Sequence, residues 1–291
     1  RKIGAVPGSG VAEISGGLLS TAGSTGVFFP GTGDAVLLDN AALADGDIEE
    51  TLRIDTGARN GLIVPLGAGA LVTEASTGSR ADQLRVIAAY GAKGDRISCE
   101  EPAGSITTRV GVVVGCADGA VLAVENDDGG IALEKITYPA GAAAPATTFS
   151  ARKGRPTVAG LGSDAGTWLL DTREQAWRWI PSETPLLEAA SVDNEAGHVV
   201  TVGVDGVVRV YEATTGSLLA ETEPLLAKTL LEAHDDPDLL DGIALTVDAN
   251  RAYLNAPAEG VVYEIDYADG ARIARVLETK TRPVHLVEVG R

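Results

Sequence analysis

A repeated β-hairpin is the feature that most constrains this fold. In residues 109–125, two apolar, β-branched runs, 110–116 and 120–124, flank the segment Ala117-Asp118-Gly119. Asp-Gly between such runs is a strong hairpin signal, because glycine adopts a positive φ without steric cost. The segment therefore predicts two antiparallel strands joined by a short turn.

Similar runs recur along the chain in six sets of about four strands each. A turn glycine closes successive sets at Gly119, Gly166, Gly206 and Gly260, with spacings of 47, 40 and 54 residues. A period of about 40–50 residues with four strands per repeat is typical of β-propeller blades, since one blade cannot bury both of its faces alone. A β-sandwich would need far fewer strands. The predicted fold is an all-β propeller with about six complete four-stranded blades in a single domain, residues 1–291.

Helical patterns are short, at residues 41–45 and 223–233, and both are expected to be insertions between strands. A last strand is expected at residues 284–289, as the inner strand of a further blade that residues 3–6 help to complete. Either that blade is short or its other strands lie upstream of Arg1, and we expect the second. The chain has no Met, which indicates a processed or trimmed product.

Charge and hydropathy restrict the partners. The chain has 41 acidic and 23 basic residues and a formal charge of -18, so it repels a phosphate backbone, and we expect no nucleic-acid partner. The acidity is better explained by a solvated surface than by cation attraction. No run approaches the roughly 20 apolar residues that cross a bilayer, so no transmembrane segment is expected, although a lipid anchor on a lost N-terminus remains an alternative.

Cys99 and Cys116 are the two cysteines of the chain, at the ends of predicted strands 17 positions apart. No further cysteine and no nearby histidine completes a zinc cluster around them. We therefore expect one disulfide, which implies an oxidising compartment. Closing a loop of this length contributes about 3 kcal/mol in the chain-entropy model.

Several ordered motifs resemble one family. They cover nearly the whole chain and are densest between residues 28 and 139; they lie at 28–29, 35–39, 55–57, 64–67, 115–119, 135–139, 251–254 and 260–266. Together they resemble the secreted β-propeller metallochaperones of zinc ABC transporters, the AztD type. The resemblance implies a full ring of seven or eight blades, the first one or two of which this chain lacks. It also implies a periplasmic or cell-surface location and a zinc-transport solute-binding protein as partner.

The resemblance further implies zinc ligands in two loops. Family members are expected to supply histidines after the Asp-Thr-Gly motif and after the first cysteine. Here those loops are residues 57–61 and 99–105, and neither contains a histidine. Arg59 in the first loop opposes a cation by its fixed charge. The predicted metal site is therefore reduced to His234, Asp235 and Asp236, with a solvated Asp-Pro turn as the alternative reading of that segment.

No catalytic constellation is recognisable, so we expect no enzyme activity and no cofactor besides zinc. His198 and His285 are expected to be structural, and three scattered histidines give no reason to assemble a triad. Two hypotheses remain. One is a secreted propeller with a degenerate zinc site that exchanges metal with a transport component, and the other is a metal-free scaffold that binds another cell-surface protein.

Overall fold

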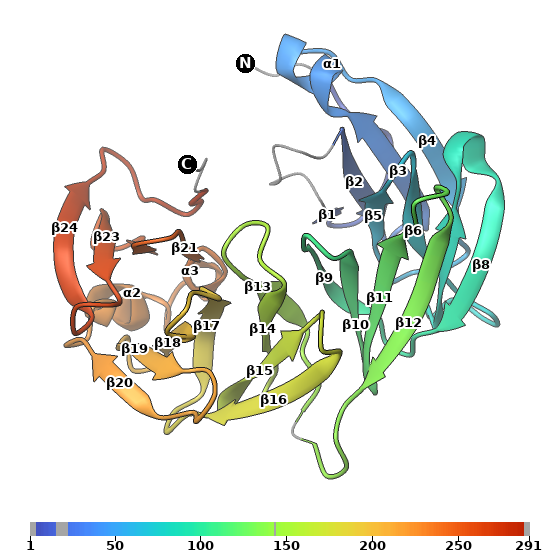
Figure 1. Cartoon of the computed structure of the whole chain (residues 1–291). Helices are drawn as coiled ribbons and strands as arrows, with labels where there is room; N and C mark the ends of the chain where they lie inside the picture. The colour runs from blue at the N-terminus through green and yellow to red at the C-terminus, as the bar shows by residue number, and fades with distance from the viewer. Residues whose placement is uncertain (1–3, 16–22, 143, 288–291) are drawn as a thin grey trace. The chain divides into compact units, whose positions relative to one another are not determined.

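The computed structural model describes residues 4–15, 23–142 and 144–287. Within them the chain forms six four-stranded antiparallel sheets, so the all-β propeller with six visible blades is confirmed (Figure 1). We number these sheets blade 1 to blade 6 in chain order. Blades 1–3 belong to one compact unit, Arg1–Tyr138, and blades 4–6 to a second, Pro139–Arg291.

The first unit holds twelve of the strands in three meanders. Blade 1 consists of β1 (Glu13–Ser15), β2 (Ser24–Phe29), β3 (Asp34–Asp39) and β4 (Glu50–Asp55). Blade 2 consists of β5 (Ile63–Leu66), β6 (Gly69–Glu74), β7 (Gln83–Ile87) and β8 (Lys93–Ser98), with a 3-10 turn, η1 (Ala89–Gly91), before β8. Blade 3 consists of β9 (Ala103–Thr107), β10 (Val112–Cys116), β11 (Gly119–Glu125) and β12 (Ile131–Thr137).

The second unit repeats this arrangement. Blade 4 consists of β13 (Thr148–Ser150), β14 (Thr157–Leu161), β15 (Gly166–Asp171) and β16 (Ala176–Pro181). Blade 5 consists of β17 (Leu186–Ser191), β18 (His198–Gly203), β19 (Val208–Glu212) and β20 (Leu218–Glu221). Blade 6 consists of β21 (Leu245–Val247), β22 (Ala252–Ala256), β23 (Val261–Asp266) and β24 (Arg272–Glu278).

The hairpin predicted in residues 109–125 is formed by β10 and β11. Cys116 pairs with Gly119, so Ala117 and Asp118 make a two-residue loop. The positive φ falls on Gly119 itself, at 151°. A Cβ there would lie 2.1 Å from the carbonyl oxygen of Ile136 in β12. Glycine is therefore required chiefly by the close approach of the fourth strand, and Gly166 meets the carbonyl of Ile180 in blade 4 in the same way.

Cores lie between successive blades of each unit. Blades 2 and 3 share a cluster of buried residues, which we name seam 2–3: Leu62, Val64, Leu71, Leu84, Val86, Cys99, Val112, Val114, Cys116, Val121 and Ala123. Blades 5 and 6 share a larger one, seam 5–6: Ala190, Val192, Val200, Val202, Val208, Val210, Leu226, Ile243, Leu245, Val247, Ala252, Leu254, Ala256, Ile265, Tyr267 and Ala271. Facing β-branched and leucine side chains exclude water from both seams, as expected when neither face of a blade can be buried alone.

In the described part of the chain, three α-helices interrupt the strands. The pattern at residues 41–45 forms α1 (Asn40–Asp45), where the Asp39 carboxylate accepts a hydrogen bond of 2.8 Å from the amide of Ala42. The pattern at residues 223–233 forms the shorter α2 (Ala227–Glu232), and a second helix, α3 (Asp238–Asp241), follows it. Helix α3 was not predicted, although Pro237 at its start was an available signal because proline favours the first turn of a helix.

The predicted strand at residues 284–289 is wrong for the part that the structure describes. Residues 282–287 form no strand; Asn255 donates a side-chain hydrogen bond to the carbonyl of Pro283, and the amide of Val284 turns back to Arg282 at 3.1 Å. The alternating sequence fits a strand, but the tail is held by a side chain and not by a strand edge. Residues 4–6, expected to help complete the same blade, form no strand either, and residues 3, 288 and 289 of these expected strands lie outside the described residues.

Candidate functional site

The predicted ligands lie in a helical insertion between blades 5 and 6, formed by α2 and α3. The insertion is fastened by Glu259 in the β22–β23 turn. One oxygen of Glu259 accepts hydrogen bonds from the amides of Lys228 and Thr229 at 2.8 and 3.1 Å, and the other accepts from the Thr229 hydroxyl. The Lys228 ammonium donates to the carbonyl of Ala258 at 2.6 Å. A carboxylate at the first turn satisfies amides that have no partner within the helix, and this fixes α2 on blade 6.

His234, Asp235 and Asp236 occupy the turn between α2 and α3, and all three are exposed. Their backbone closes the turn, because the amides of Asp235 and Asp236 both donate to the carbonyl of Glu232 at 3.0 Å. The Glu232 carboxylate is engaged by Arg282 at 2.8 Å. The structure therefore presents one imidazole and two carboxylates on a solvated turn.

These side chains are not gathered into a ligand shell. Within residues 4–15, 23–142 and 144–287, no three His, Cys, Asp or Glu side chains are placed so that they could hold a metal ion together. Zinc prefers four ligands of this kind in tetrahedral arrangement. The turn offers donors of the right chemistry, but the zinc site at His234, Asp235 and Asp236 stays a prediction.

The two loops in which the resemblance places histidines are occupied by internal contacts. In the first loop the Arg59 guanidinium donates to the carbonyl of Thr32, and its amide donates to Ser79 at 2.6 Å. In the second loop Glu101, at a φ of 49°, pairs with Arg80. A cation at the first loop would meet a fixed positive charge, as the sequence predicted.

His198 begins β18 and is held in one tautomer. Its Nδ1 lies 2.8 Å from the side-chain nitrogen of Asn194, whose oxygen accepts the His198 amide at 3.0 Å. Because Nδ1 accepts a hydrogen bond, the proton is assigned to Nε2. The ring packs 5.3 Å from that of Tyr267, and burial lowers the pKa of His198. These contacts fit the structural role expected of His198, whereas His285 is exposed in the C-terminal tail.

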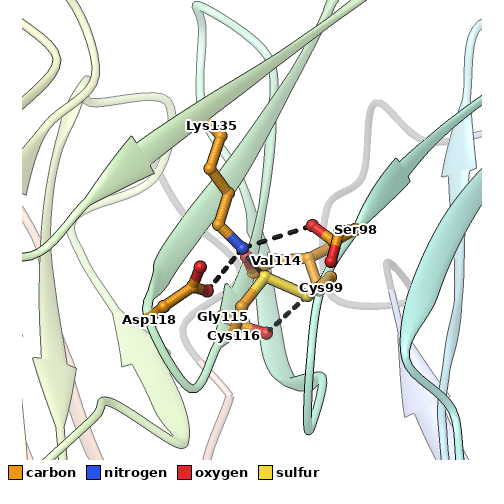
Figure 2. The surroundings of a disulfide bond; sticks show 7 residues. All are labelled: Ser98, Cys99, Val114, Gly115, Cys116, Asp118 and Lys135. Atoms are coloured by element: carbon orange, nitrogen blue, oxygen red, sulfur yellow. Dashed lines mark hydrogen bonds and ion pairs between the residues drawn. A yellow bond between two sulfur atoms is a disulfide. The ribbon is translucent and has the colours of Figure 1, made fainter.

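The predicted disulfide between Cys99 and Cys116 is confirmed (Figure 2). Cys99 follows β8 in blade 2 and Cys116 ends β10 in blade 3, and both are buried within seam 2–3. Beside it, the Lys135 ammonium contacts Asp118 at 2.6 Å and the carbonyl of Ser98 at 3.2 Å. The bond is therefore a covalent link between neighbouring blades.

One partly buried carboxyl stands apart from these groups. Glu188 in β17 lies opposite Val202, on the face of blade 5 that forms seam 5–6. Burial raises the pKa of Glu188 to about 7. Desolvation disfavours its ionised form, so protonated and ionised forms of this carboxyl coexist near pH 7. The sequence analysis did not predict a role for Glu188, although a glutamate inside an apolar strand was a usable signal.

Comparisons with solved structures identify the same fold in other proteins. The structure of apo AztD from Citrobacter koseri superposes with a TM-score of 0.75 and 18% identity, over 93% of this chain and 73% of that chain. A second crystal structure of Citrobacter koseri AztD gives 0.76 and 18% over 96% and 74%. BamB from Moraxella catarrhalis gives 0.55 and 13% over 92% and 76%. At sequence identities of 13–18%, this structural similarity establishes that the proteins share a fold.

Comparison with protein-family models gives no match, and comparison with curated protein sequences gives none either.

Proposed function

We propose that this chain is a non-catalytic, secreted β-propeller that handles zinc as cargo and exchanges it with the solute-binding protein of a zinc ABC transporter. The observation that carries the proposal is the likeness to AztD, which extends over 93–96% of the chain. Ordered motifs such as residues 115–119 and 260–266 add a resemblance in sequence.

The zinc donors that we assign are His234, Asp235 and Asp236. An imidazole nitrogen and carboxylate oxygens are ligands that zinc accepts. Since all three side chains are exposed, water or groups of the partner protein would complete the coordination. Such a site binds weakly and releases its metal readily, which suits transfer to a protein with a closed site.

The buried disulfide supports a location outside the cytoplasm, because such bonds persist in oxidising compartments. Among the described residues, the longest helices fall far short of the length and apolar character that a membrane-spanning helix requires.

Calorimetric titration of chelator-treated protein with zinc tests the proposal. We expect saturable binding with a Kd on the order of tens of micromolar or tighter. His234→Ala should abolish this binding, whereas the matched variant His285→Ala, which removes another exposed histidine, should leave it unchanged. Absence of binding in that range, or equal binding by His234→Ala, would contradict the assignment.

A second candidate is a metal-free scaffold that binds another cell-surface protein. It is favoured by Arg59, whose guanidinium occupies the loop in which the resemblance places a zinc ligand. Under this alternative the same titration gives no heat of zinc binding, and a solute-binding protein retained on the immobilised chain is retained equally with and without chelator.

A further inference from the structure

An open cleft runs along the outer strands of blades 2 and 3 and encloses about 880 Å³. Its lining consists of Arg85 in β7, residues 94–97 in β8 and residues 131–133 in β12. Ligand sites commonly have volumes of about 300–1,000 Å³. The cleft therefore has room for several residues of another chain.

The cleft follows strand edges and not one sheet face. Residues 94–97 are consecutive, and successive side chains of a strand point to opposite faces of the sheet. A surface that contacts all four must lie along the edge of β8, and the same holds for residues 131–133 of β12. Both strands are the last in their sheets, with β7 and β11 as their neighbours in the described sheets. A row of backbone groups along such an edge can pair with an added strand.

One end of this cleft is fixed. Lys135 of β12 donates to the carbonyl of Ser98 at the end of β8, and the disulfide of Cys99 follows immediately (Figure 2). The lining residues of β8 and β12, 94–97 and 131–133, come before these two contacts in the sequence. The hydrogen bond and the disulfide therefore join the two strands at the end of the cleft and not across it.

The charge of the lining favours an acidic occupant. Arg85 and Arg96 stand directly opposite each other in the β7–β8 pair, an arrangement that costs stability. Glu74 neutralises Arg85 at 2.6 Å and also binds Lys93 at 3.3 Å. Arg96 is exposed, and none of the ion pairs between described residues includes it. Asp95 also lines the cleft, so Arg85, Lys93 and Arg96 stand against Glu74 and Asp95, three basic groups against two acidic ones. In a chain of net charge -18, this local excess of positive charge is distinctive.

The alternation of side chains along β8 also predicts which residue types a docked peptide should carry at successive positions. Arg96 lies on one face of β8, whereas Asp95 and Ile97 lie on the other. Ile97, Ile131 and Leu133 are partly buried and pack against seam 2–3. A strand added to this edge would place every second side chain on the face of Arg96 and the others on the face of Asp95 and Ile97. Acidic residues are favoured at the first set of positions and uncharged apolar residues at the second.

We propose that this cleft docks an extended peptide segment of a partner protein with alternating acidic and apolar residues, which adds as a strand to the edge of β8 and pairs a carboxylate with Arg96. The proposal does not depend on zinc binding.

The test is fluorescence anisotropy on the full chain with a labelled probe, the acetylated peptide Glu-Val-Glu-Val-Glu-Val. We expect saturable binding below about 1 mM. Arg96→Glu should weaken it at least about tenfold and Arg96→Gln about threefold, since a charge-assisted hydrogen bond is lost. Arg109→Glu, an equal charge change at an exposed arginine outside the lining, should leave binding unchanged.

Two further probes separate the sources of affinity. A peptide with proline in place of each valine loses every second amide and is held in a polyproline conformation, so it cannot continue a sheet edge and should not bind. A peptide with lysine in place of each glutamate should not bind either. Equal binding by the proline peptide, or by Arg96→Glu with an unchanged melting temperature, would overturn the proposal. Zinc affinity should be the same in Arg96→Glu as in the parent, so failure here is distinct from failure of the zinc site.

Discussion

Seam 2–3 and seam 5–6 each hold two neighbouring blades together, but through different interactions. Seam 2–3 has the smaller buried cluster and carries the disulfide between Cys99 and Cys116. Seam 5–6 contains no cysteine but adds Leu226 and Ile243 from the helical insertion and Tyr267 from a loop. Seam 2–3 therefore adds a covalent link to a smaller apolar core, whereas seam 5–6 relies on the burial of a larger one.

The largest expected effect is the loss of packing in seam 5–6. Leu254 in β22 is fully buried, so Leu254→Ala should lower the free energy of unfolding by about 2–5 kcal/mol through lost burial and the cavity left behind. Urea unfolding followed by circular dichroism measures this. The control Leu277→Ala, at a leucine that is 43% exposed in the same blade, should cost far less; equal costs would contradict the role assigned to the seam.

Removal of the disulfide between Cys99 and Cys116 should have the second largest effect on stability. The double variant Cys99→Ala with Cys116→Ala should lose about 3 kcal/mol, because the unfolded chain regains the freedom of a closed loop. Thermal unfolding of parent and variant, each with and without reductant, measures the loss. Reductant should have no effect on the variant, and a melting temperature equal to that of the parent would show that the smaller core of seam 2–3 is sufficient alone.

A third prediction concerns the partly buried carboxyl of Glu188, beside seam 5–6. Desolvation raises the pKa of Glu188 to about 7 in the folded protein, from an ordinary value of 4.5. Between these values the unfolded chain releases the proton and the folded chain retains it, so this residue makes stability fall as pH rises and imposes its full cost above pH 7. Glu188→Gln should therefore gain about 1–3 kcal/mol over the parent at pH 8 and little at pH 4. Urea unfolding at both values measures the difference, and a gain independent of pH would exclude this cause.

The smallest effect on stability is expected from the ion pair between Lys135 and Asp118, which lies beside the disulfide. Lys135→Met keeps the aliphatic stem but removes the contacts with Asp118 and the carbonyl of Ser98. Since Asp118 is 62% exposed, the cost should be about 0.5 kcal/mol. Thermal unfolding at low and high salt measures it, and a loss as large as that of the cysteine variant would mean that the pair, and not the disulfide, holds the blades together.

Local patterns were sufficient to predict the fold. The Ala117-Asp118-Gly119 turn and the spacing of Gly119, Gly166 and Gly206 indicated the blade repeat, because strand alternation and turn chemistry act over a few residues. The tail at residues 284–287 was mispredicted because strand formation there is not a local matter. A segment with alternating side chains becomes a strand only if the edge of another strand is free to pair with it.

The candidate sites were less predictable. Cys99 and Cys116 could be paired from the sequence because they were the only two cysteines. The exposure of His234 and the edge cleft beside Arg96 depend on how loops and neighbouring blades pack, which a single sequence does not state. Glu188 was overlooked because its desolvation depends on the packing around β17, which the local sequence pattern does not show.

The carboxylate of Glu259 has a consequence for the order of folding. Helix α2 has only six residues, too few to persist alone in water, and its first amides are bonded to a residue that lies about thirty positions later in the chain. Formation of α2 must therefore wait until the β22–β23 turn exists. During refolding, protection of the Lys228 and Thr229 amides from hydrogen exchange should therefore report when blade 6 has formed, although both amides belong to a helix outside that blade.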